Sequence, residues 1–153
     1  MGAPVTMDYV VNEQTVAERP TAVIAATTTW AAFPSLWRQL LDEVWQVVRS
    51  NEAIGPGRNV MLYKDDVPNV EIGVEARQAF AAIGRVVPSG LPAGRVATTT
   101  HRGAYDGIGA AHKAVTNWCD GHGLRRTGTR WEIYGHWTPD VAEQTVEIHY
   151  LLG

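Results

Sequence analysis

The same order of sequence patterns occurs twice along the chain, and this repeat limits the possible folds more than any single motif. Three short matches carry it, each pair separated by about 70 residues: ATTTW at 26–30 with ATTTH at 97–101, MLY at 61–63 with EIY at 132–134, and VEI at 70–72 with VEI at 146–148. Matches that keep one order and a shared spacing indicate a duplicated structural unit.

Each copy predicts a strand, a helix and two further strands. In the first copy, β-branched residues over 16–29 predict a strand, and apolar residues at helical spacing over 36–50 predict an amphipathic helix. Residues 59–63 and 69–76 predict two short strands separated by a polar turn. In the second copy, a new helical pattern starts near residue 108 and lies between the matched strands.

The sequence therefore predicts an α+β fold of tandem duplicated βαββ units with pseudo-two-fold symmetry. The repeat halves cover about 5–80 and 86–153, and together they form a single domain over 1–153. One helix cannot cover both faces of a three-stranded sheet, so we expect the halves to pack together. A central ligand groove between them is the natural binding site.

Charge and composition exclude several classes of function. The formal net charge is −3 and the 13 Lys and Arg residues are dispersed, so we expect no direct nucleic-acid binding. The sequence shows no leader pattern and no apolar run near the roughly 20 residues that span a bilayer, so we expect a cytoplasmic protein without membrane association. We expect this protein to be a monomer or a homodimer. The histidines and Cys119 lack metal-ligand spacing, so we predict no metal and no cofactor.

The segment RWEIYGHW at 130–137 places a carboxylate, Glu132, among aromatic rings in a predicted strand. Strand alternation puts Glu132, Tyr134 and His136 on one face, and puts Trp131, Ile133, Gly135 and Trp137 on the other. We expect the second face to pack under the helices and the first to face the groove. The alternative is a solvated strand face on which Glu132 pairs with a neighbour such as Arg130.

Aromatic residues that carry a polar group in the side chain are frequent: the chain has 6 Trp and 5 Tyr against 2 Phe. Trp30 and Phe33 fall at a strand-to-helix junction and can serve the core or a groove mouth equally. Trp37 lies on the apolar stripe of the first helix, which favours a core role over a ligand wall. Further candidate ligand contacts are Tyr63, His101, Trp131, His136 and Trp137.

Two candidates, His101 and Tyr105, belong to the second-half segment HRGAYDG. His101 occupies the repeat position of Trp30 and either faces it across the groove or is a hydrogen-bonded strand-end histidine. Tyr105, in HRGAYDG, lies in a strand-to-helix loop, a position that often carries function.

The stretch VATTTHRGAYDGIGAAHKAVTNWCDGHGL, followed by RWEIYGHW and VEIHYLL, resembles the GyrI-like small-molecule-binding domains. The resemblance runs from about Val16 to the end of the chain and implies a duplicated βαββ fold with a central groove. Glu132 and Tyr134 match the family's glutamate and the tyrosine two residues later, which the family places in that groove. The positions of Trp30, Trp37, Trp131 and Trp137 resemble a free-standing branch known as cyclopropanoid hydrolases.

The resemblance leaves three functions open. The first is binding of planar hydrophobic molecules with hydrolysis of the cyclopropane of DNA-alkylating natural products, which gives detoxification and self-resistance. There, Glu132 would deprotonate a water, and Tyr134 or Tyr105 would donate a hydrogen bond to the carbonyl oxygen. The second is non-catalytic binding of drugs or effectors that are lipophilic cations. The third is a protein-interaction domain acting on a DNA topoisomerase.

Overall fold

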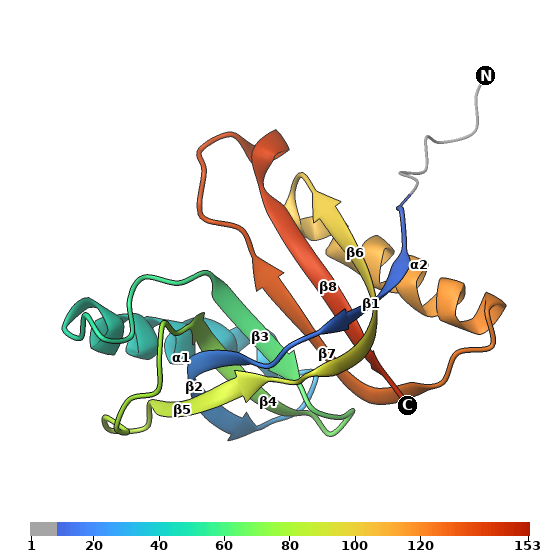
Figure 1. The fold of residues 1–153 in the computed structure, drawn as a ribbon. Coiled ribbons are helices and arrows are strands. Elements are labelled where there is room, and N and C mark those ends of the chain that lie inside the picture. The colour runs from blue at the N-terminus through green and yellow to red at the C-terminus, as the bar shows by residue number, and fades with distance from the viewer. Residues whose placement is uncertain (1–8) are drawn as a thin grey trace.

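The computed structural model describes residues 9–153 as one antiparallel sheet of eight strands with two α-helices (Figure 1). The strands are β1 (Asn12–Val16), β2 (Arg19–Thr27), β3 (Asn59–Tyr63), β4 (Asn69–Glu75), β5 (Val87–Leu91), β6 (Gly94–Arg102), β7 (Arg126–Tyr134) and β8 (Thr145–Leu152). The helices are α1 (Phe33–Arg49) and α2 (Ile108–Gly121), with short 3-10 turns η1 (Tyr105–Gly107) and η2 (Val141–Glu143). Residues 5–8 of the predicted first half lie outside the described residues.

The strand order is β1-β6-β8-β7-β3-β4-β2-β5, and all neighbours pair antiparallel. The predicted α+β class is confirmed. Strands β3 and β7 meet at the centre of the sheet, where Met61 pairs with Glu132. The order strand, helix, strand, strand occurs over 19–75 and again over 94–152. The duplication and the pseudo-two-fold symmetry themselves stay a prediction.

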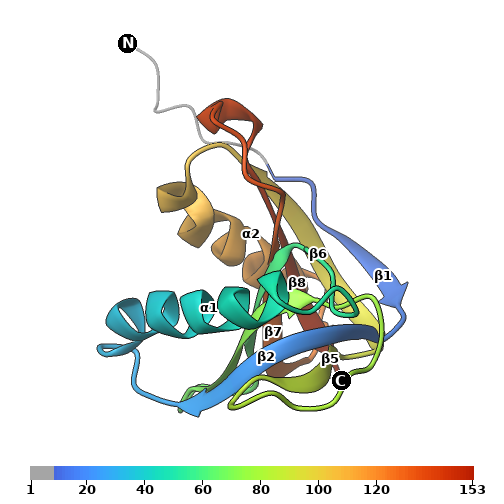
Figure 2. The same ribbon diagram turned by 90° about the vertical axis from the view of Figure 1, so that its left-hand side faces the viewer.

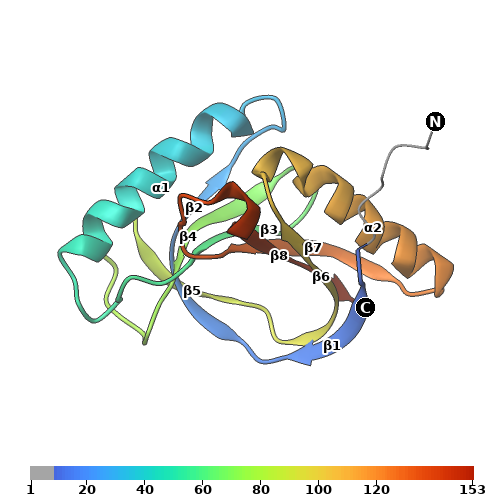
Figure 3. The same cartoon turned by 90° about the horizontal axis from the view of Figure 1, so that it is seen from above.

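Both helices pack on one face of the sheet through apolar stripes (Figures 2 and 3). Helix α1 starts with a proline in its first turn and buries Leu40, Leu41, Val44 and Val48. Helix α2 buries Ala111, Val115 and Cys119, so the thiol is a packed core group. Neither α1 nor α2 has the length and apolar character of a membrane span.

The opposite face of the sheet has its own apolar cluster, to which neither α-helix contributes. Trp131 and Ile133 are buried there with Val60, Leu62 and Val96. The expectation that Trp131 and Ile133 pack under the helices is therefore wrong. The physical reason is that β1 and β5 extend the curved sheet, and Val16, Val87 and Leu91 from these strands cover the face that the helices leave free.

Candidate functional site

A cavity of about 390 Å³ lies on the helix-bearing face, between α1, the start of α2 and the central strands. Its lining residues are Phe33, Trp37 and Leu41 from α1, Asn59, Met61 and Tyr63 from β3, Tyr105 and Ile108 before and at the start of α2, and Glu132, Tyr134, Gly135 and Trp137 from β7 and the segment after it. Half of these residues are aromatic, and none of the described Lys or Arg residues is among them. The cavity is thus a lipophilic space with one acidic side chain.

Glu132 lies at the floor of this cavity and is only 5% exposed. Its Oε1 atom accepts hydrogen bonds from the hydroxyl of Tyr63 at 2.9 Å and from the hydroxyl of Tyr134 at 2.8 Å. Its Oε2 atom lies 2.6 Å from Nε2 of His112. Each carboxylate oxygen is therefore hydrogen-bonded, as a buried acidic group requires.

The two tyrosines that contact Glu132 are held in their protonated form. Burial raises the pKa of the Tyr63 phenol and of the Tyr134 phenol, and the nearby Glu132 charge raises both further. Both hydroxyls consequently stay donors to the carboxylate over the physiological pH range.

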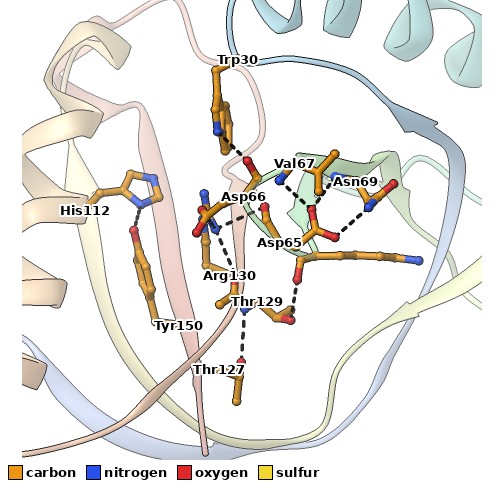
Figure 4. Close-up of polar contacts among 12 residues, drawn as sticks. Trp30, Asp65, Asp66, Val67, Asn69, His112, Thr127, Thr129, Arg130 and Tyr150 are labelled. Carbon is orange, nitrogen blue, oxygen red and sulfur yellow. Dashed lines mark hydrogen bonds and ion pairs between the residues drawn. The ribbon is translucent and has the colours of Figure 1, made fainter.

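His112 reaches Glu132 from helix α2 and continues the hydrogen-bonded chain to β8. Its Nδ1 atom lies 2.7 Å from the hydroxyl of Tyr150 (Figure 4). Sequence reasoning assigned no role to His112 beyond the absence of metal-ligand spacing. One available signal was its position four residues after Ile108, since residues at this spacing share a helix face and Ile108 lines the cavity.

An aromatic cluster of Trp30, Phe33 and Tyr63 stands beside the cavity. The Tyr63 ring centroid lies 5.7 Å from that of Trp30 and 5.5 Å from that of Phe33. The guanidinium of Arg130 sits over Trp30 at 5.3 Å and over Tyr63 at 5.6 Å.

Arg130 is engaged away from Glu132. Its Nη1 atom pairs with the Asp66 carboxylate at 2.8 Å, while the Trp30 indole donates to the Asp66 carbonyl oxygen at 3.2 Å (Figure 4). The alternative in which Glu132 pairs with Arg130 on a solvated face is therefore wrong, because Glu132 is buried and bonded to other partners.

Most of the predicted site residues meet at this cavity. Glu132, Tyr134, Tyr105, Phe33, Trp37, Tyr63 and Trp137 line it, and Trp30 packs on two of the lining rings. Trp37 is thus part of a wall rather than only of the core. The apolar wall residues Leu41, Met61 and Ile108 were not predicted. The reason is that an apolar residue in a sequence pattern is equally compatible with a core position and with a ligand contact.

Three predicted ligand contacts lie elsewhere. His101 is buried and bonds to the Tyr9 hydroxyl and the Ala104 carbonyl oxygen, each at 2.7 Å, so it is a hydrogen-bonded strand-end histidine that does not face Trp30. Trp131 stacks on His149 on the far face of the sheet. His136 follows the end of β7 and is exposed, because the strand alternation that placed it beside Glu132 ends at Tyr134.

The far face also carries a polar cluster around Arg58, which bonds to Glu75 and to Glu147, each at 2.7 Å. The hydrogen bond from His149, together with Arg58, lowers the pKa of Glu147 to about 2. These groups hold strands together. Across residues 9–153 no group of three or more His, Cys, Asp or Glu side chains is arranged to hold a metal ion.

A cavity of a few hundred Å³ with aromatic walls and one convergent acidic group suits a small organic ligand. Fold and site together define a small-molecule-binding domain. The profile of the GyrI-like small molecule binding domains matches residues 10–152, so the chain belongs to this family.

Several solved structures share the fold. The crystal structure of the EcmrR C-terminal domain aligns with a TM-score of 0.76 at 22% identity, over 96% of this chain and 99% of that one. SAV2435 bound to tetraphenylphosphonium aligns with a TM-score of 0.73 at 14% identity, over 96% and 94%. A hydrolase from Listeria innocua aligns with a TM-score of 0.60 at 10% identity, over 94% and 91%. No curated protein sequence matches the chain significantly.

Proposed function

We propose that the cavity binds planar, lipophilic small molecules and prefers those that carry a positive charge. The observation that carries this proposal is the buried carboxylate of Glu132 at the floor of an aromatic cavity that no described Lys or Arg lines. Arg130, whose guanidinium lies over the Trp30 and Tyr63 rings, has its charge paired with Asp66.

The aromatic rings and the carboxylate make different contributions to binding. Phe33, Trp37 and Trp137 supply apolar contact area and ring faces, which attract both flat ligands and cations. Glu132 supplies charge selectivity, because an ionic attraction is strong where little water screens it. A structure of the same fold, SAV2435, is bound to tetraphenylphosphonium, a lipophilic cation, which supports the proposal.

The test compares two ligands of nearly the same shape, N-methylquinolinium and neutral 1-methylnaphthalene. Both would be titrated into the protein at pH 8 while the tryptophan fluorescence is followed, since Trp37 and Trp137 line the cavity. We expect quenching by both ligands and an affinity for the cation at least about tenfold higher, which corresponds to about 1.4 kcal/mol. Equal affinities would refute the charge preference, and no quenching by either would refute the binding site.

We propose ring-opening hydrolysis as a second function, on cyclopropane-bearing DNA-alkylating natural products, with detoxification as its result. One observation favours it. The hydroxyls of Tyr63 and Tyr134 are bonded to Glu132. The hydroxyl of Tyr105, which lines the same cavity, makes no hydrogen bond to any residue of 9–153. The fold shared with a Listeria innocua hydrolase also supports it.

In this reaction Glu132 would take a proton from a water whose oxygen attacks a cyclopropane carbon. The carbon–carbon bond breaks, its electron pair moves to the conjugated carbonyl, and Tyr105 donates a hydrogen bond to the oxygen that gains charge. Protonation of that oxygen completes the addition of one water. Mass spectrometry of alkylators incubated with the protein would detect the gain of one water, and its absence for every substrate tested would leave the binding function alone.

A further inference from the structure

Of the three residues bonded to Glu132, His112 alone is not part of the cavity lining. Its Nε2–Oε2 distance of 2.6 Å is shorter than the bonds from Tyr63 and Tyr134. It comes from α2 rather than from the sheet, and its side chain keeps 21% of its surface exposed. It is therefore a titratable group in direct contact with the acidic group of the site.

We propose that His112 is a specificity-determining residue, whose protonation state sets whether Glu132 presents a net negative charge to a bound ligand. This inference rests on the proposed function, because it concerns the charge preference of the same cavity. It predicts that the cavity prefers cations when His112 is neutral and loses that preference when His112 is protonated.

The hydrogen-bonded chain allows both states without moving a side chain. When His112 is neutral, Nε2 donates to Glu132 and Nδ1 accepts from the Tyr150 hydroxyl, and the pair carries one negative charge. When His112 is protonated, both ring nitrogens donate and the Tyr150 oxygen accepts, so the pair has no net charge. A phenol both donates and accepts, which makes Tyr150 a suitable partner for either state.

His112 is the one histidine among the described residues that bond to Glu132. Histidine is the side chain whose unperturbed titration falls between about pH 5 and 8. The phenols that face His112 and Glu132 from the neighbouring elements are Tyr134 on β7, Tyr63 on β3, Tyr150 on β8 and Tyr105 in η1, and phenols ionise near pH 10 or above.

The strands packed against α2 carry two histidines, His101 on β6 and His149 on β8. His101 is bonded to Tyr9 and Ala104, and His149 lies on the far face of the sheet against Glu147 and Trp131, so neither makes a hydrogen bond to Glu132. Arg130, on the same strand as Glu132, keeps its charge at every pH considered. His112 is thus the group expected to control the charge at the floor of the cavity.

The experiment measures the affinities of N-methylquinolinium and 1-methylnaphthalene between pH 5.5 and 8.5 for the parent protein and for His112→Gln. The glutamine amide can donate to Glu132 and accept from Tyr150, but it carries no charge at any pH. His122→Gln is the matched control, since His122 is exposed at the end of α2 and bonds to the Trp118 carbonyl oxygen.

In the parent protein and in His122→Gln, we expect the preference for the cation to fall about tenfold from pH 8.5 to pH 5.5, which corresponds to about 1.4 kcal/mol. In His112→Gln, we expect a preference that stays constant over this range. The same profile for the parent and His112→Gln would overturn the inference. A cation preference at pH 8.5 that never changes with pH would overturn it too, while leaving the proposed function intact.

A measurement on the unaltered protein covers the case in which His112→Gln fails to fold. By reciprocal linkage, a cation that favours neutral His112 must move the midpoint of the His112 ring titration to lower pH, as followed by NMR. The neutral naphthalene should leave that midpoint in place. Equal effects of the two ligands on the midpoint would contradict the inference.

Discussion

Glu132 depends for its environment on two other segments and on a neighbour in its own strand. Tyr63 comes from β3, His112 from α2, and Tyr134 follows Glu132 by two residues on the same strand face. Because a buried carboxylate is costly unless it is hydrogen-bonded, these three contacts must form together. The acidic floor of the cavity is therefore a property of the assembled sheet and helix rather than of the segment RWEIYGHW alone.

Replacing Tyr134 by Phe removes one of the two donors to Oε1 of Glu132 while it keeps the ring. We expect a loss of about 1–3 kcal/mol in the free energy of unfolding, because the buried carboxylate loses one of its hydrogen-bond donors. Urea denaturation at pH 7 measures it. Tyr105→Phe is the control, since no described residue bonds to its hydroxyl, and its unfolding free energy should stay within about 0.5 kcal/mol of the parent.

Alkaline pH should weaken the fold through the buried phenols. The pKa values of Tyr63 and Tyr134 are raised by burial and by Glu132, so the folded protein keeps these protons while the unfolded chain releases them near pH 10. Their contribution to stability is therefore complete below about pH 10 and is lost as the pH rises further.

Absorbance at the phenolate band during a pH titration checks this expectation. Tyr63 and Tyr134 should ionise only together with unfolding, as seen in parallel by circular dichroism. Ionisation of all five phenols near pH 10 in the folded protein would contradict the buried arrangement.

At the scale of elements, periodicity predicted the buried parts well. The expected strand at 59–63 coincides with β3, that at 69–76 is one residue longer than β4, and α1 begins three residues before the expected 36. The edge strands β1 and β5 were missed, because their sequences NEQTV and VPSGL lack alternation and pair with distant segments. Without β1 and β5, the sequence patterns could not show that Trp131 is buried on the far face of the sheet.

The close approach of β2 and β4 depends on a glycine. A Cβ atom at Gly73 would overlap the carbonyl oxygen of Ala22 on the paired strand. We therefore expect Gly73→Ala to lower the free energy of unfolding by more than about 2 kcal/mol, because backbone in a central strand cannot move aside. Urea denaturation is again the measurement.

Gly109→Ala is the matched control for this substitution. A Cβ atom at Gly109 meets no atom within 4 Å, and alanine is favoured over glycine in a helix by about 1 kcal/mol. Gly109→Ala should therefore be neutral or stabilising. Equal losses for both variants would show that the β2–β4 contact is not the cause.

At the scale of the whole molecule, the cavity needs both halves of the chain. Phe33, Trp37 and Tyr63 come from the first half, and Tyr105, Glu132 and Trp137 from the second. The repeat and the family resemblance predicted a groove between the halves, and strand alternation predicted that Glu132 faces it. The position of His112 could not be predicted, because it depends on how α2 crosses the sheet, which spacing along one helix does not determine.

Because residues of both halves line the cavity, a ligand bound there should stabilise the entire fold. A cation at a concentration of about one hundred times its dissociation constant should add about 2.7 kcal/mol to the free energy of unfolding. Thermal denaturation followed by circular dichroism should show one transition that moves to higher temperature with ligand. Stabilisation of only part of the transition would show that the ligand contacts one half alone.

The measurement that tests the central claim most directly is calorimetric titration of N-methylquinolinium and 1-methylnaphthalene into the parent protein and into Glu132→Gln at pH 8. Glutamine keeps the size of the side chain and removes its charge. If the carboxylate selects cations, the quinolinium affinity falls at least about tenfold in Glu132→Gln, equivalent to about 1.4 kcal/mol, and the naphthalene affinity stays within about threefold. An unchanged quinolinium affinity in a folded Glu132→Gln protein would contradict the role assigned to Glu132.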